Sequence, residues 1–160
     1  MGFGVRLEVQ SQVFDAGPLS VLTVHRIRPV TELDPEVGEP TGPEVTVEHD
    51  VDLVDDVNGA GLLYFASFLS VVERVQLRRW RSLGRSGRSF LERRVSSFRI
   101  CYLGNADLDT TLSIQLRTSS DPRDATWEKS DLQVRDVCTN RTVAVVSATR
   151  FGPGRQPALP

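Results

Sequence analysis

Apolar and polar residues alternate in several short segments of this chain, which is the pattern of β-strands that bury one face. Two such segments open the chain, from Leu7 to Phe14 and from Leu19 to Arg26, with turn residues from Asp15 to Pro18 between them. Four more follow later in the chain: Val95 to Leu103, Thr110 to Thr118, Trp127 to Val137 and Thr142 to Phe151. The alternation predicts an N-terminal β-hairpin and a later antiparallel meander.

One long segment between these strands has helical periodicity instead. From Asn58 to Trp80, apolar residues recur at spacings of three and four, which predicts a helix with one apolar face. The predicted face consists of Leu62, Phe65, Ala66, Leu69, Val72, Glu73, Gln76 and Trp80. Glu73 interrupts this face, so its carboxylate is either paired with an arginine of the fold or held desolvated as a general base.

The order of the predicted elements favours one fold. A short strand at Val45 to Val47, one long helix and four further strands is the order of the α+β hot-dog fold, in which an antiparallel sheet wraps a long central helix. We expect an N-terminal hairpin at residues 1–29, a Pro- and Gly-rich exposed linker at 30–44, the hot-dog domain at 45–151 and a flexible tail at 152–160.

The first hairpin resembles the segment from Leu132 to Arg150, since both are amphipathic hairpins that end in arginine. One interpretation is that the first hairpin is the remnant of a preceding hot-dog unit. The other is that any two amphipathic hairpins look alike.

Composition narrows the classes of function. The chain has 160 residues, 39% hydrophobic and 25% charged, which describes one ordinary soluble domain with a full core. A net charge of -2 gives no overall reason to expect nucleic acid or an anionic membrane as a partner. Cys101 and Cys138 lie in strand-like contexts without further ligands at metal spacing, so we expect buried thiols, no metal site and a cytoplasmic location.

The polar segment before the predicted helix carries the first group of candidate site residues. Asn58 suits an N-cap, and Asp56 precedes it where negative charge meets the helix dipole. Gly59 and Gly61 would leave backbone N–H groups open to a thioester oxygen. Tyr64 is either a structural residue or a phenol that accepts an acyl group or donates a hydrogen bond to an enolate.

His25 and His49, in contrast, occur in strand-like contexts, and we expect both to be packing residues.

A second polar cluster follows the strand that ends near Leu103. Asn105 and Asp107 are typical of a plain turn, since both residue types tolerate the backbone that a turn requires. They become candidate substrate-binding residues if the fold brings this corner to the helix start.

Basic residues concentrate at the end of the helix and in the loop after it. They are Arg74, Arg78, Arg79, Arg81, Arg85, Arg88, Arg93 and Arg94. The ordinary interpretation is a solvated helix end whose charge complements the dipole. The alternative is that arginines such as Arg85 and Arg88 bind the phosphates of coenzyme A, or a phosphopantetheine arm and its acidic carrier protein.

The two polar segments, Asp56 to Phe68 and Tyr102 to Asp107, resemble the double hot-dog acyltransferase/decarboxylase family of polyketide biosynthesis, typified by the leinamycin pathway. The resemblance extends from Val45 to Arg150. It implies that a methylmalonyl group is taken from coenzyme A, decarboxylated and delivered as propionyl to an acyl carrier protein, with Tyr64 as the acyl acceptor. No bound cofactor is implied, because the coenzyme A or phosphopantetheine thioester is the substrate.

This chain is shorter than the family's double unit, so a homodimer is expected to supply the second unit. Two alternatives stay open. The first is a hot-dog thioesterase, in which Asp56, Asn58 or Glu73 positions water. The second is a hot-dog module that binds an acyl group without turnover.

Overall fold

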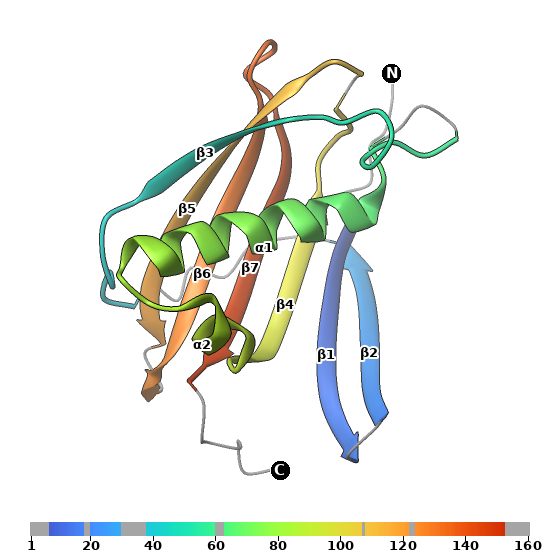
Figure 1. The fold of residues 1–160 in the computed structure, drawn as a ribbon. Helices are drawn as coiled ribbons and strands as arrows, with labels where there is room; N and C mark the ends of the chain where they lie inside the picture. Colours follow the sequence, from blue (N-terminus) through green and yellow to red (C-terminus); the bar gives the residue numbers. More distant parts are fainter. Residues whose placement is uncertain are drawn as a thin grey trace.

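The computed structural model describes residues 7–17, 20–29, 38–59, 63–106, 108–121 and 124–152. Its strands form one antiparallel sheet in the order β2-β1-β4-β7-β6-β5-β3, and a long helix lies across one face (Figure 1). The elements are β1 (Leu7–Gly17), β2 (Ser20–Pro29), β3 (Val45–Asp50), α1 (Phe65–Ser82), α2 (Gly87–Leu91), β4 (Arg94–Tyr102), β5 (Thr111–Asp121), β6 (Asp124–Asp136) and β7 (Thr142–Phe151). The predicted α+β architecture is confirmed.

The N-terminal hairpin extends this sheet at one end. Strand β1 pairs with β2 along its length, and with β4 from Leu7 opposite Tyr102 to Ser11 opposite Phe98. Strand β3 lies at the other end, where Val45 to Asp50 pair with β5. Whether the hairpin is the remnant of another unit stays a prediction.

The inner face of α1 differs in phase from the predicted face. Phe68, Val71, Val72 and Val75 are buried against the sheet, whereas Leu69 is 36% exposed. Sheet residues of β5, β6 and β7 complete this core: Leu112, Ile114, Leu116, Leu132, Val134, Val143, Ala144 and Val146. The spacing of three and four was therefore right, but the apolar stripe was assigned one helix position away from its true place.

The helix also begins later than predicted, since α1 starts at Phe65, whereas the sequence predicted a start near Asn58. Val57 pairs with Leu63 in an isolated bridge, and the Tyr64 N–H donates to the Asp56 carbonyl over 2.7 Å. The chain therefore doubles back before the helix, and Tyr64 is the N-cap residue. The prediction that Asn58 is the N-cap residue is wrong.

Two further local predictions need correction. The loop expected after the long helix contains the start of α2, whose N-cap Ser86 accepts a hydrogen bond from the Ser89 N–H. Cys101 is buried as expected, but Cys138 is exposed in the turn between β6 and β7. Within the described ranges, no helix is long and apolar enough to cross a membrane.

Truncation of a core leucine should destabilise the fold strongly. Leu116 is 0% exposed, so Leu116→Ala should lower the free energy of unfolding by about 2–5 kcal/mol through lost burial and a residual cavity. Leu91→Ala is the matched control, because Leu91 is 82% exposed and its loss should cost less than about 0.5 kcal/mol. Urea denaturation measures both, and equal effects would contradict the assigned core.

Candidate functional site

The two polar segments predicted as site residues lie along one edge of the sheet. After β3 the chain runs along this edge to the start of α1, and the corner after β4 lies at the same edge (Figure 1). The Val51 N–H donates to the Thr110 carbonyl over 3.0 Å, which joins the chain just before the first segment to the chain just after the second. Leu63 and Ala106 also share one buried cluster. The helix start and the corner therefore form one candidate site, which we call the helix-start site.

Asp56 organises this site through its side chain and its backbone. The residue is 4% exposed, and its Oδ2 accepts hydrogen bonds from the Asp52 N–H at 2.9 Å and from His49 Nε2 at 2.8 Å. Its carbonyl accepts from the Tyr64 N–H at 2.7 Å and from Ser67 Oγ at 3.3 Å. Asp56 thus joins β3, the following turn and the first turn of α1.

The protonation of this pair follows from its hydrogen bonds. Burial acts to raise the pKa of Asp56, but the bonds from the Asp52 N–H and from His49 outweigh it and hold the pKa below its ordinary value. The ionised carboxylate only accepts, so His49 Nε2 carries the proton of this hydrogen bond and Nδ1 is the other ring nitrogen. The expectation that His49 is a packing residue is wrong. Sequence spacing could not reveal the pair, since the two residues lie on different elements.

Tyr64 belongs to the candidate site through its backbone bond to Asp56. It is 44% exposed at the N-cap position, and its side chain makes no capping hydrogen bond. Asn58 and Gly59 are exposed in the loop that the Val57–Leu63 bridge closes, and a Cβ on Gly59 would meet nothing within 4 Å. These two residues are therefore near the helix start without being part of it.

Two of the predicted substrate-binding residues cannot be placed. Gly61 and Asp107 lie outside the described residues.

Of the two alternatives for Glu73, an ion pair with an arginine or a desolvated general base, the structure shows the ion pair. Its side chain is 59% exposed, and its Oε1 accepts a hydrogen bond from Arg150 Nη2 at 3.0 Å. It lies on the outer side of α1 because the helix phase differs from the predicted one. The prediction of a desolvated carboxylate at this position is wrong.

The corner after β4 is held by both side-chain and ring contacts. The Asn105 carbonyl accepts from Arg141 Nη2 at 3.0 Å. Next to it, Tyr102 packs edge to face on Phe68 of α1, with ring centroids 5.2 Å apart. Burial raises the pKa of Tyr102 to about 12, so this phenol stays neutral. Asn105 therefore belongs to the same edge as Tyr64.

Arg85 and Arg88 lie elsewhere. The 18 residues of α1 span about 27 Å, and both arginines follow the C-terminal end of that helix, whereas Tyr64 precedes its N-terminal end. The Arg85 guanidinium lies 4.2 Å from the centroid of the Trp80 ring, and Arg88 is exposed on α2. The structure does not bring these arginines to the helix-start site of the same chain.

No candidate metal centre occurs among the described residues. These residues include no group of three or more His, Cys, Asp or Glu side chains that could hold a metal ion. The described polar side chains at the helix-start site include those of His49, Asp56, Asn58 and Tyr64.

Neither a scan against protein-family models nor a search of curated proteins finds a match to this sequence. Solved structures do match. The chain is similar to 1,4-dihydroxy-2-naphthoyl-CoA thioesterase from Synechocystis, with 18% identity and a TM-score of 0.62 over 68% of this chain and 81% of that one. It is also similar to a thioesterase from Thermus thermophilus complexed with coenzyme A and Zn, with 20% identity and a TM-score of 0.61 over 72% and 84%.

A third likeness is to 4-hydroxybenzoyl-CoA thioesterase from Pseudomonas sp. strain CBS-3, with 12% identity and a TM-score of 0.60 over 69% of this chain and 85% of that one. At such low identity these likenesses establish the fold. The chain has the hot-dog fold, as the order of its elements predicted.

The stability of the helix-start site should depend on the charge of Asp56. Because its pKa is lowered in the folded state, its stabilising effect is complete above the ordinary value of 3.8 and is lost as pH falls through the folded value. Asp56→Asn should lower the free energy of unfolding at neutral pH by about 1–3 kcal/mol. The free energy of unfolding of this variant should also decrease less steeply than that of the parent chain as the pH is lowered. Denaturation between pH 7 and pH 3 tests this.

Asp55→Asn is the matched control, because Asp55 is the exposed neighbour in the same turn. It should keep the pH profile of the parent chain. An Asp56→Asn profile that runs parallel to the parent's across this range would contradict the assigned charge.

Proposed function

We propose that this chain is a hot-dog thioesterase that hydrolyses an acyl-CoA thioester. The observation that carries the proposal is the His49–Asp56 pair, which lies beside the start of α1 and joins it through the Asp56 carbonyl. The similarity to thioesterases, one of them complexed with coenzyme A, supports the substrate class.

The reaction can be assigned to groups of this chain. Asp56 holds the Nε2 proton of His49, and Nδ1 takes a proton from water while the water oxygen bonds to the thioester carbon. The carbon–sulfur bond then breaks, and the thiolate of coenzyme A recovers that proton from His49. The products are a free acid and coenzyme A.

Charge that develops on the thioester oxygen needs hydrogen-bond donors. The first backbone N–H groups of α1, at Phe65 and Ala66, have no intrahelical partner by geometry, and no side chain caps them at Tyr64. Such donors stabilise an oxyanion. The Asn58 amide in the neighbouring loop is the side-chain donor that we assign to the same oxygen or to the water. Asn105 is the contact that we assign to the substrate from the corner, whereas Glu73 is engaged by Arg150 and has no role here.

Acyl transfer through Tyr64 is the second candidate, and the exposure of its side chain at the N-cap favours it. In this version the Tyr64 oxygen accepts the acyl group from coenzyme A, and the group then passes to the thiol of an acyl carrier protein. Decarboxylation of a methylmalonyl group and a place in polyketide biosynthesis belong to this candidate.

A homodimer is part of either proposal. Large apolar residues are exposed in the turn before the helix-start site and on the outer side of α1, among them Leu53 at 53%, Val54 at 88% and Leu69 at 36%. Exposed apolar residues that gather around a site are typical of an interface. We propose that a second copy covers this edge and completes the acyl pocket.

Substitutions at the helix-start site should separate hydrolysis from transfer. We expect His49→Gln to lower kcat for acyl-CoA hydrolysis by at least about 100-fold, which is the smaller effect expected for loss of a general base. Tyr64→Phe should leave kcat within about twofold. Chromatography of free acid and coenzyme A is the measurement, because the exposed thiol of Cys138 would interfere with thiol reagents.

Asp55→Asn serves as the control for substitutions in this region and should retain full activity. If Tyr64→Phe abolishes product and removes an acyl adduct seen by intact mass in the parent chain, transfer replaces hydrolysis. If the chain binds acyl-CoA saturably but forms no free acid, acyl adduct or acyl carrier product, it is a binding module without catalytic activity.

The basic end of α1 should bind an acidic carrier protein. About 27 Å separates it from Tyr64, which suits a carrier that covers a wide surface better than it suits coenzyme A alone. The double variant Arg85→Glu, Arg88→Glu should raise KM for an acyl-carrier substrate by about 10-fold, and less at high salt. KM for acyl-CoA should change less than about twofold.

Arg135→Glu on β6 is the matched charge reversal, since Arg135 is also exposed, and it should leave both KM values unchanged. Unchanged KM for the carrier substrate in the double variant would contradict carrier docking at this surface.

A further inference from the structure

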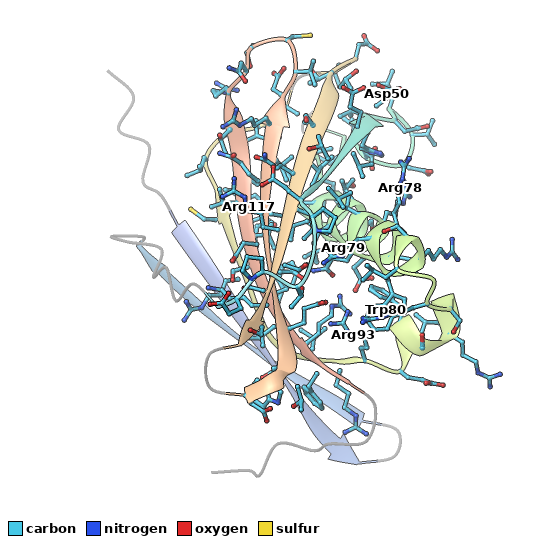
Figure 2. The ribbon with its side chains drawn as sticks, turned by 90° about the vertical axis from the view of Figure 1, so that its left-hand side faces the viewer. Asp50, Arg78, Arg79, Trp80, Arg93 and Arg117 are labelled. Atoms are coloured by element: carbon cyan, nitrogen blue, oxygen red, sulfur yellow. The ribbon has the colours of Figure 1, made fainter. Side chains whose placement is uncertain are left out.

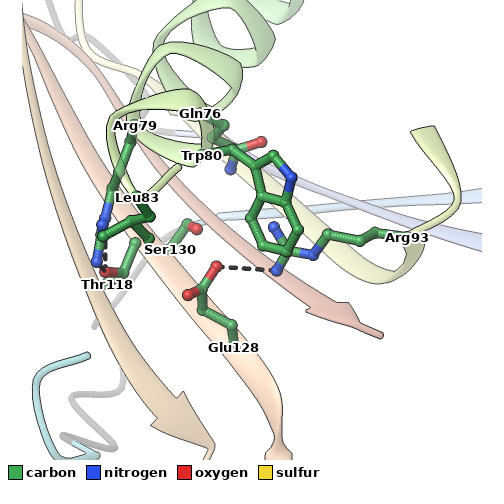
Figure 3. Close-up of a pocket in the computed structure, with 8 residues that line it drawn as sticks. All are labelled: Gln76, Arg79, Trp80, Leu83, Arg93, Thr118, Glu128 and Ser130. Carbon is green, nitrogen blue, oxygen red and sulfur yellow. Dashed lines mark hydrogen bonds and ion pairs between the residues drawn. The ribbon is translucent and has the colours of Figure 1, made fainter. Parts of the chain in front are cut away.

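A small polar cavity lies under the C-terminal end of α1, away from the helix-start site (Figure 3). Its volume is about 10 Å³, and its polar lining comes from α1, from the residue before β4 and from strands β5 and β6. The polar side chains are Gln76, Arg79, Arg93, Thr118, Glu128 and Ser130. Gln76 follows Tyr64 by 12 residues, or about 18 Å along the helix, so the cavity is separate from the proposed thioesterase chemistry.

Gln76 is the first reason to expect a ligand there. The residue is 5% exposed, and neither its Nε2 nor its Oε1 has a hydrogen-bond partner among the described residues. Buried amides are nearly always hydrogen-bonded in folded proteins, since an unpaired amide loses its interactions with water. A side chain of this kind that lines a cavity indicates an occupant with which it can bond.

Arg79 is the second reason. It is 3% exposed and lies between α1 and the sheet (Figure 2). Its Nε donates to Thr118 Oγ1 at 2.8 Å and its Nη2 donates to the same oxygen, with Thr41 Oγ1 a further 3.5 Å contact of Nη2. Both partners are neutral hydroxyls. Across the described ranges, no carboxylate pairs with this guanidinium.

The charge balance of the cavity depends on an ion pair in its lining, between Arg93 and Glu128. Arg93 Nη2 lies 2.8 Å from Glu128 Oε1, so these two side chains neutralise each other. Among the described residues, Arg79 is then left as one positive charge without a counter-charge. A buried charge without a counter-charge is strongly unfavourable, and an anion would correct this.

We propose that the cavity binds one small inorganic anion of the chloride class, held by the Arg79 guanidinium, the Gln76 amide N–H and the Ser130 hydroxyl. The cavity is small, so a single-atom anion suits it better than phosphate or a carboxylate does. Water would give Gln76 a partner but would leave the charge of Arg79 uncompensated. The anion is a structural ligand, because the cavity lies far from Tyr64.

The first test compares chloride with gluconate at equal ionic strength. Thermal unfolding of the full chain should show a Tm that rises with chloride and then follows the logarithm of its concentration, as expected for one site on the folded state. Ser130→Ala should shift this response to higher chloride concentration, and Arg79→Met should remove it. Arg78→Gln, an exposed arginine next to Arg79, should retain the response of the parent chain.

The second test places the ion directly. Crystals grown or soaked in sodium bromide should show an anomalous peak in the cavity, and Gln76→Leu should remove that peak. Equal Tm values in chloride and gluconate at every matched ionic strength would overturn the proposal, as would the absence of a bromide peak. A peak without any chloride dependence of Tm would mean an adventitious ion only, and that outcome also overturns it.

Discussion

The burial of α1 against the sheet is the constraint on which the rest of the structure depends, and its inner face changes character along the helix. Phe68 and Val72 lie in an apolar core at the N-terminal half, whereas Gln76 and Arg79 are buried at the C-terminal half. The apolar half gains stability from burial alone. The polar half needs hydrogen-bond partners, and Arg79 finds them in the hydroxyl groups of Thr118 on β5 and of Thr41. Gly42 permits the contact with Thr41, because a Cβ there would lie 2.9 Å from Arg79 Nη2.

The helix-start site depends on hydrogen bonds to one residue. Asp56 is bonded to β3 through His49, to its own turn through Asp52 and to α1 through Tyr64. Because the backbone of Asp56 fixes Tyr64 while its carboxylate fixes His49, the two candidate catalytic side chains share one support. The same bonds that hold the fold at this edge therefore orient the groups that we assign to the chemistry.

The sequence predicted the strands well, since alternation is a local signal, and the buried residues of β5 and β6 do alternate along each strand. The helix start was mispredicted because Asn58 and Gly59 resemble a capping segment, whereas the true start depends on the Asp56–Tyr64 bond and the bridge that closes the loop. Glu73 was placed on the inner face for a different reason, because the apolar stripe was assigned one helix position away from the buried one. The His49–Asp56 pair was missed because its members meet only after β3 and the turn have folded.

The arginines that the sequence grouped as one surface patch fall into different physical environments. Arg85 and Arg88 are exposed, whereas Arg79 is buried without a carboxylate and Arg93 is buried with Glu128. An apolar side chain in place of a buried charge is often neutral or stabilising, so a buried arginine is poorly explained by stability alone. A bound anion explains it, because the guanidinium then has a counter-charge. The end of α1 thus has two basic regions, an exposed one that can meet a carrier protein and a buried one that can hold an ion.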